Sequence, residues 1–165
     1  MSTRQDIFAN LVDENQGIIH KVCRTYADSD EEHKDMFQEV VLQLWSSFDS
    51  FKEESKFSTW MYRVALNTAI TLFRKKKKAI TTTEIEEYHS HQYKEIVEHD
   101  KQEEIDILYK SIKQLTEIER ALVLLYLEEK PYKEIAETIG ITEGNARVKI
   151  NRVKVKLKEI MQQWI

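Results

Sequence analysis

The scarcity of glycine and proline constrains the fold of this chain more than any other feature of its sequence. Its 165 residues include 3 Gly and 1 Pro. Sandwiches, barrels and doubly wound sheets need many tight turns, and such turns depend on these two residue types. Charged residues make up 33% of the chain and hydrophobic residues 41%, a mixture typical of amphipathic helices. The sequence therefore predicts an all-α fold.

A chain of this length forms one domain of ordinary size or two small ones. Helical spacing of apolar residues predicts helices over about 3–27, 30–45 and 58–78, and later ones from about 105 to 115, then over 117–128, 132–139 and 143–163. Residues 48–57 are polar between aromatics and predict a loop or a broken turn. Residues 79–101 lack a strong apolar period, so we interpret them as a linker between two helical domains, 1–78 and 102–165.

Local capping signals indicate where the helices of the second domain begin and end. Thr116 and Glu119 have the spacing of a capping box, and Thr142 suits the N-cap of the last helix. Gly140 suits the left-handed residue that ends a helix. Two helices joined by a short turn that contains glycine predict a helix-turn-helix.

The charges are segregated along the chain. The formal net charge is -4, from 25 basic and 29 acidic residues. Yet residues 56–78 contain 7 basic residues and no acidic one, and residues 144–158 contain 6 basic residues and no acidic one. Residues 79–101 contain 6 acidic and 2 basic residues. We expect charged patches rather than a neutral surface, with the basic patches suited to nucleic acid.

The predicted last helix has two distinct faces. On a helical wheel, Arg147, Asn151, Lys154 and Lys158 share one sector, and another side is apolar through Ala146, Ile150, Val153, Leu157 and Ile160. A DNA major groove admits such a helix, where Arg and Asn read base edges and Lys neutralises phosphates. We therefore expect this helix to bind DNA.

The first basic segment alternates cations with aromatic residues, a pattern that holds opened or single-stranded nucleic acid. We expect Trp60 and Phe73 to lie in the core. Arg63 and Asn67 are four residues apart and so share a helix face, from which they can reach one base together.

Evidence for catalysis or a metal is weak. Asp35, Gln38, Glu39 and Gln43 form a polar helix edge, but no nucleophile, histidine or glycine-rich loop accompanies it, so we interpret it as a protein-binding edge. His89 and His91 have no second ligand pair to complete a metal site. The single cysteine, Cys23, and the absence of a signal peptide or a long apolar run predict a soluble cytoplasmic protein with no membrane insertion. We expect no cofactor, no metal and no enzymatic activity.

Three segments, in order, resemble the extracytoplasmic-function (ECF) sigma factors of the sigma-70 family. They are residues 35–45 (DMFQEVVLQLW), residues 57–67 (FSTWMYRVALN), and the pair 132–136 (YKEIA) and 144–147 (GNAR). The resemblance implies a subunit that joins core RNA polymerase, directs it to particular promoters and helps to melt them. Residues 1–78 would then be the sigma-2-like domain and residues 102–165 the sigma-4-like domain.

The same resemblance implies roles for single residues. The residues that dock on the β′ clamp helices of polymerase would be Asp35, Gln38, Glu39 and Trp45. The residues that capture a flipped base of the minus-10 element and hold its strand would be Lys52, Ser55, Lys56, Phe57, Arg63, Asn67 and Arg74. The residues that read the minus-35 element would be Arg147, Val148, Lys149, Asn151 and Arg152.

Further implications concern the other partners. The polymerase β flap would be a second contact, an anti-sigma factor would control the protein, and the linker 79–101 would thread through polymerase. The sequence departs from the family at Glu53 and Glu54, where Gly and Asp are common.

Two other interpretations remain open from the residues alone. A conventional helix-turn-helix regulator would bind duplex operator DNA without polymerase and use its first domain for dimerisation or ligand binding. A small hydrolase or metal-dependent enzyme would use His89, His91 and nearby carboxylates.

Overall fold

The computed structural model describes residues 3–80 and 99–164, and all of the regular secondary structure in these residues is helical. The all-α prediction is confirmed. The chain divides into two compact units, Met1–Gln92 and Tyr93–Ile165. Among the described residues, no helix has the length and apolar character needed to cross a bilayer.

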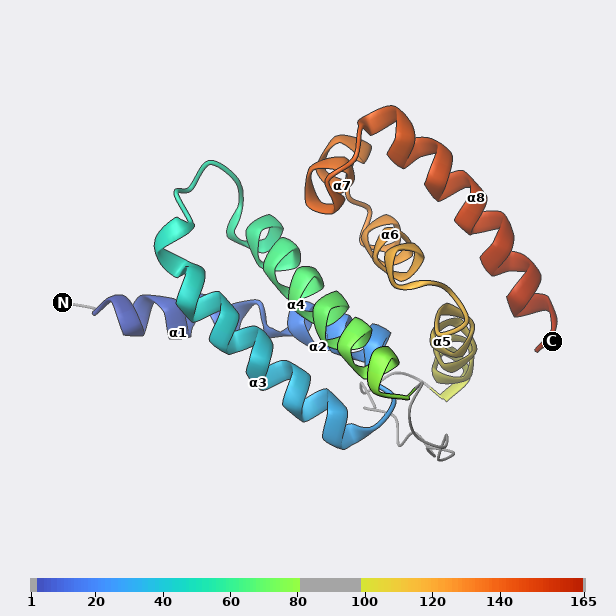
Figure 1. Cartoon of the computed structure of the whole chain (residues 1–165), viewed down its shortest axis with the longest axis horizontal. Helices are drawn as coiled ribbons and strands as arrows, with labels where there is room; N and C mark the ends of the chain where they lie inside the picture. Colours follow the sequence, from blue (N-terminus) through green and yellow to red (C-terminus); the bar gives the residue numbers. More distant parts are fainter. Residues whose placement is uncertain (1–2, 81–98, 165) are drawn as a thin grey trace. The chain divides into compact units, whose positions relative to one another are not determined.

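The first unit is a small bundle around one long helix (Figure 1). Its elements are α1 (Arg4–Glu14), α2 (Gln16–Tyr26), α3 (Asp30–Ser47), the short 3-10 helix η1 (Phe48–Ser50) and α4 (Phe57–Ile80). The long α4 packs against α2 and α3, and α3 runs antiparallel beside it. The core between these helices includes Ile19, Val22, Tyr26, Val40, Leu44, Met61, Tyr62, Ala65, Leu66 and Ala69.

The single helix expected over residues 3–27 is wrong, because the chain breaks at Asn15 into α1 and α2. Asn15 has φ -117° and ψ 12°, and its Nδ2 donates a hydrogen bond of 2.8 Å to the Leu11 carbonyl. An asparagine side chain that bonds to nearby backbone competes with helix continuation. The apolar spacing runs through the break, so periodicity did not indicate it.

Two predicted core residues of α4 differ from expectation. The helix begins at Phe57, close to the expected start at about residue 58, and the Trp60 amide donates to the Lys56 carbonyl at 3.2 Å. Trp60 and Phe73 are half-buried rather than core residues. Trp60 instead lies against the half-buried ring of Phe57, and Phe73 lies against the ring of the buried Tyr26.

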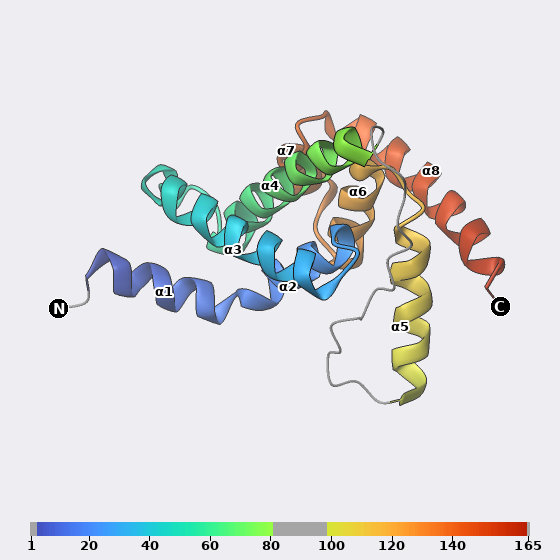
Figure 2. The ribbon, with the colours of Figure 1, turned by 60° about the horizontal axis from the view of Figure 1, so that its bottom comes forward.

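The second unit consists of α5 (His99–Ile112), α6 (Glu117–Leu127), α7 (Tyr132–Ile139) and α8 (Glu143–Gln162). The long α8 packs against the other three (Figures 1 and 2). Its core includes Ile112, Leu115, Ala121, Leu122, Leu125, Ile135, Ala136, Ala146, Ile150 and Val153. α5 begins inside the range expected for the linker.

The predicted capping signals of this unit are confirmed. Glu119 N donates to Thr116 Oγ1 at 3.3 Å, and Thr116 N donates to Glu119 Oε1 at 3.0 Å. Gly140 has φ 85°, the left-handed conformation that ends α7. Asn145 N donates to Thr142 Oγ1 at 3.1 Å, which caps α8. The helix-turn-helix over α7 and α8 is therefore specified locally.

A buried arginine holds the turn between α5 and α6. Arg120 is 5% exposed, its Nε donates to the Leu115 carbonyl at 3.0 Å, and its Nη2 donates to the Lys113 carbonyl at 2.6 Å. These carbonyls lie in the turn that follows α5, and buried backbone acceptors of this kind need a hydrogen-bond donor. The charge of Arg120 thus serves the fold rather than a surface.

Candidate nucleic-acid and protein interfaces

The outward face of α8 carries most of the residues predicted to read DNA. The apolar side expected for this helix is confirmed, because Ala146, Ile150, Val153, Leu157 and Ile160 are buried. Arg147, Val148, Asn151 and Arg152 are exposed on the opposite side. Lys149 is half-buried at the border of the two faces, so the structure sets it apart from the other four.

Two cations of α8 lie over tyrosine rings that the sequence patterns did not single out. The Arg147 guanidinium carbon is 4.7 Å from the centre of the Tyr132 ring, at the start of α7. The Lys154 Nζ atom is 4.6 Å from the centre of the Tyr126 ring, near the end of α6. Cation–ring contacts of this length are attractive. The cations of α8 are therefore supported by aromatic rings from α6 and α7.

One cation of the same segment stabilises the fold instead. Lys156 Nζ is 3.0 Å from Glu119 Oε1, which joins α8 to the capping box of α6. Burial raises the pKa of the Glu119 carboxyl, but the hydrogen bonds from Thr116 and Lys156 outweigh it, so that its pKa lies below the ordinary value. The acid-free stretch 144–158 therefore does not present all its charges to a partner.

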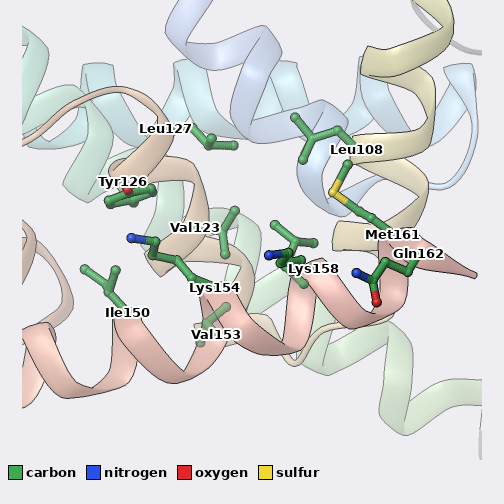
Figure 3. Close-up of a pocket in the computed structure, with 11 residues that line it drawn as sticks. Leu108, Val123, Tyr126, Leu127, Ile150, Val153, Lys154, Lys158, Met161 and Gln162 are labelled. Atoms are coloured by element: carbon green, nitrogen blue, oxygen red, sulfur yellow. The ribbon is translucent and has the colours of Figure 1, made fainter.

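An apolar groove of about 470 Å³ lies between α5, α6 and α8 of the second unit (Figure 3). Apolar side chains line most of it: Leu108, Val123, Leu127, Ile150, Val153, Leu157 and Met161. Lys154 and Lys158 also line it, and Figure 3 shows the Lys154 nitrogen reaching toward the Tyr126 ring. We did not expect this groove from the sequence, although residues 121–127 form an apolar run that surrounds α6 and cannot all face one core.

In the first unit, α4 presents a polar and basic stripe. Arg63, Asn67 and Arg74 are all exposed, and their spacing of four and seven residues keeps them on one side of the helix. At the rise of an α-helix, Arg74 lies about 25 Å along the axis from Phe57. The structure therefore brings Arg63 and Asn67 together near the start of the helix and places Arg74 toward its far end.

Lys76 lies on another side of α4, where its ion pairs stabilise the fold. Its Nζ atom is 2.9 Å from Asp28 Oδ2 and 2.5 Å from Glu32 Oε1, which ties α4 to the start of α3. Burial lowers the pKa of the Lys76 ammonium, but the hydrogen bonds and charges of Glu32 and Asp28 outweigh burial, and its pKa lies above the ordinary value. The polybasic end of α4 is therefore exposed on one side and neutralised on the other.

The loop before α4 combines exposed polar residues with a half-buried ring. Lys52, Ser55 and Lys56 are exposed, whereas Phe57 is half-buried, with its ring centre 5.4 Å from Phe51 and 5.5 Å from Trp60. Glu53 has φ 58°, a left-handed conformation that glycine adopts more easily. This is the position where the resembling family often has glycine.

The aromatic cluster continues from this loop to α3 and α1. Phe48 has ring centres 6.3 Å from Trp60 and 6.5 Å from Trp45, and Phe8 is 5.0 Å from Trp45. Arg4 lies over Trp45 at 4.9 Å and pairs with Asp49 at 2.7 Å. The predicted base-binding loop and the predicted polymerase contact Trp45 therefore share one packed support.

The outer face of α3 carries the predicted polymerase contacts and one apolar residue besides. Asp35 and Gln38 are exposed, Glu39 is half-buried and Trp45 is 37% exposed. Leu42 lies among them and is 60% exposed. We did not assign it a role from the sequence, although it falls outside the apolar stripe that packs α3 and adds apolar area to this face.

No metal site is found among the described residues of the structure. Among residues 3–80 and 99–164, no group of three or more His, Cys, Asp and Glu side chains is placed to hold a metal ion. His89 and His91 lie outside the described residues. In the first unit, His20 Nδ1 and His33 Nε2 are 3.0 Å apart and join α2 to α3.

Known families match both units. Residues 11–79 match Sigma-70 region 2, and residues 105–157 match Sigma-70 region 4. The RNA polymerase sigma factor SigZ of Bacillus subtilis is 30% identical, over 78% of this chain and 72% of its own length. The chain belongs to the ECF sigma factors of the sigma-70 family. The ECF RNA polymerase sigma factor SigW of the same organism is 28% identical to this sigma factor, over 94% of this chain and 89% of its own.

Two solved structures share the fold, one of them a sigma factor. The sigma factor RpoE in complex with the anti-sigma factor NepR from Bartonella quintana has a TM-score of 0.72 and 18% identity, over 94% of this ECF sigma factor and 96% of that chain. CnrH in complex with the cytosolic domain of CnrY has a TM-score of 0.69 and 17% identity, over 97% and 90% of the two chains. The family matches and the sigma-factor relatives show that this chain is a DNA-binding factor of transcription initiation that works with RNA polymerase.

Proposed function

We propose that this ECF sigma factor uses its second unit to read the minus-35 element of a promoter. The observation that carries the proposal is the exposed face of α8, where Arg147, Val148, Asn151 and Arg152 stand clear of a buried apolar side. The turn that orients α8 is held by Gly140 and by the Thr142 cap. A helix fixed in this way can enter a major groove with its polar side chains against base edges.

The first unit handles the minus-10 element. Extruding a base from duplex DNA costs about a few kcal/mol, so a preformed pocket and phosphate contacts must offset it. The exposed loop residues Lys52, Ser55 and Lys56 precede the half-buried Phe57, and Arg63 and Asn67 are exposed on α4. The exposed Arg74, farther along α4, contacts the backbone of the opened strand.

Core polymerase docks on the outer face of α3. Asp35, Gln38 and Glu39 provide acceptors, and the exposed Leu42 and Trp45 provide apolar area. Aromatic and apolar anchors surrounded by polar groups are typical of protein interfaces. The β flap docks on the groove of the second unit, whose apolar lining is left open by the described residues.

Control comes from an anti-sigma factor. Two proteins with this fold are solved in complexes: RpoE with the anti-sigma factor NepR, and CnrH with the cytosolic domain of CnrY. An anti-sigma factor that covers the α3 face and the groove would block polymerase at both contacts.

We further propose that the domains span residues 1–78 and 102–165 and are joined by the linker 79–101. We also propose that the factor works in the cytoplasm. It acts by binding, without catalysis of its own.

A promoter-binding assay with reconstituted holoenzyme tests the DNA assignment. Arg152→Ala should weaken binding to the cognate promoter by about 1–3 kcal/mol, because one base contact is lost. Lys101→Ala removes an exposed cation of α5 and serves as the matched control. Equal promoter affinity for the two variants contradicts the placement of α8 on the minus-35 element.

A competition assay for core polymerase tests the docking face. Glu39→Lys should lose core binding and keep the wild-type circular dichroism spectrum, because it reverses a charge in the centre of the α3 face. Glu14→Lys makes the same reversal at the exposed end of α1 and should compete normally. Normal competition by Glu39→Lys refutes the assignment. Tight operator binding without polymerase would instead favour the conventional helix-turn-helix regulator.

A further inference from the structure

We propose that Tyr132 is a positioning residue for promoter reading: its ring holds the Arg147 guanidinium so that the arginine selects guanine in the minus-35 element. The inference rests on the proposed function of α8 and goes beyond it. It assigns a role to a residue of α7 that need not touch DNA, and it names the base that Arg147 reads.

The geometry of the two residues supports this role. The Arg147 guanidinium carbon lies 4.7 Å from the centre of the Tyr132 ring. Tyr132 is the first residue of α7 and is half-buried, so packing restrains its ring. α7 and α8 pack against each other around the turn at Gly140. The ring is therefore a fixed feature beside an exposed arginine whose side chain is 58% accessible.

The second contact of Arg147 is too weak to position it alone. Arg147 Nη2 is 3.5 Å from Glu143 Oε1, and the Glu143 side chain is 52% exposed. Exposed ion pairs of this kind contribute little and are screened by salt. An arginine with several rotatable bonds then loses conformational entropy when it binds a base. A ring that already restrains the guanidinium lowers that cost.

The plane of the guanidinium explains the choice of base. A ring contact occupies the face of the group and leaves its N–H donors free at the edge. An arginine edge pairs in a bidentate manner with O6 and N7 of guanine in the major groove. Lys154, over the Tyr126 ring at 4.6 Å, is the internal comparison, because an ammonium has no such plane. The Tyr126 ring should therefore affect the affinity of the protein for promoter DNA but not its preference for a base.

The experiment measures base preference with holoenzyme assembled from the full chain and core polymerase. Promoters carry each of the four bases in turn at every minus-35 position. Wild-type holoenzyme should prefer guanine at one position by about 10-fold, the scale of one bidentate contact. Arg147→Ala should abolish that preference. Tyr132→Leu should reduce it about 5-fold, and Tyr132→Phe, which keeps the ring, should retain it.

Controls separate positioning from folding. Tyr126→Leu should leave the guanine preference unchanged, and Tyr132→Leu should have no further effect on preference in an Arg147→Ala background. If Tyr132→Leu lowers the melting temperature, Tyr132→Met replaces it, because methionine has a similar volume to leucine but an unbranched side chain that fills an irregular site more easily. Because preference is a ratio of affinities for the same protein, a loss of folded protein alone does not change it.

The two possible failures are distinguishable. If Arg147→Ala leaves every base preference unchanged, the placement of α8 on the minus-35 element fails, and the inference fails with it. If Arg147→Ala abolishes the guanine preference but Tyr132→Leu retains it fully, the proposed function stands and the role of Tyr132 is overturned. Equal losses for Tyr132→Phe and Tyr132→Leu also overturn it, because the ring would then not be the cause.

Discussion

Residues of one chemical type have opposite roles in this chain, depending on the helix side that they occupy. Lys76 pairs with Asp28 and Glu32 inside the first unit, whereas Lys77, the next residue, is exposed. Arg120 is buried against backbone carbonyls, whereas Arg152 is exposed on α8. A count of positive charges therefore overstates the charge that a DNA partner meets.

Cys23 should be chemically inert in the folded protein. It is fully buried, and burial raises the pKa of its thiol to about 12. At pH 8 the reactive thiolate is then about one part in 10,000. We expect no labelling by a thiol reagent such as Ellman's reagent until the protein unfolds, and complete labelling in guanidinium chloride. Rapid labelling of native protein would show that the α2 core opens readily.

Gly140 should be the glycine at which alanine costs stability. Its φ of 85° is left-handed, and an added Cβ would meet no atom within 4 Å, so the cost is confined to the backbone. We expect Gly140→Ala to lower the free energy of unfolding by about 1 kcal/mol in urea denaturation.

Gly17→Ala is the matched control, because Gly17 lies in α2 and its Cβ also meets open space. Alanine in a helix should raise the free energy of unfolding by up to about 1 kcal/mol. If both substitutions changed the free energy of unfolding in the same direction and by the same amount, the backbone explanation would be contradicted.

At the scale of elements, α8 combines three tasks on one helix. Its apolar side holds the core, one border pairs Lys156 with α6, and its outward side carries the candidate DNA contacts. The apolar period predicts the first task and the charge pattern predicts the third. The pairing depends on which residue of α6 lies opposite Lys156, and periodicity within one helix carries no such information.

The Glu119–Lys156 pair should make stability depend on pH in the acid range. The pKa of Glu119 is lower in the folded protein than its ordinary value, so its contribution is present above about pH 4.5. The contribution is lost as the pH falls through the lower, folded pKa. Because the pair is partly exposed, we expect Glu119→Gln to cost about 0.5–1 kcal/mol at pH 7.

The measurement is urea denaturation of both proteins at pH 7 and at about pH 3. The difference between wild type and Glu119→Gln should shrink as the pH falls, because protonation removes the charge of the wild-type carboxylate. Lys156→Met should show the same pH dependence when it is compared with wild type. A difference that stays constant across this range would mean that the carboxylate charge does not stabilise the fold.

Predictability from sequence varied among the elements. The bounds of α7 and the caps of α6 and α8 follow from Pro131, Thr116, Gly140 and Thr142, because these signals act on adjacent backbone. The break at Asn15 did not follow, because an apolar period continues through it. The positions of the candidate site residues on helix faces were predictable, but the rings under Arg147 and Lys154 were not, because they come from other helices.

At the scale of the molecule, each unit encloses its own core. The first centres on α4 with α2 and α3, and the second centres on α8 with α6 and α7. Units of this size bury a smaller share of their surface than larger domains do, so each has modest stability. The family matches also fall separately, one within each unit.

We expect residues 1–92 and 93–165 to fold as separate polypeptides. Each should give a helical circular dichroism spectrum and a cooperative thermal transition, because the buried apolar residues of each contact helices of the same unit. The full-length chain with both units intact is the reference. A fragment that is helical but binds the dye ANS and melts without a transition would show that its core needs the other unit.

The sequence by itself determined the helical class, the caps, the faces of α3, α4 and α8, and membership of the sigma-70 family, because these depend on neighbouring residues and on ordered motifs. Tertiary structure decided which cations remain available, where the groove lies, and which aromatic rings support Trp45, Phe57 and Arg147. These features join side chains far apart in the sequence. Their distances are set by helix packing, and no local pattern specifies them.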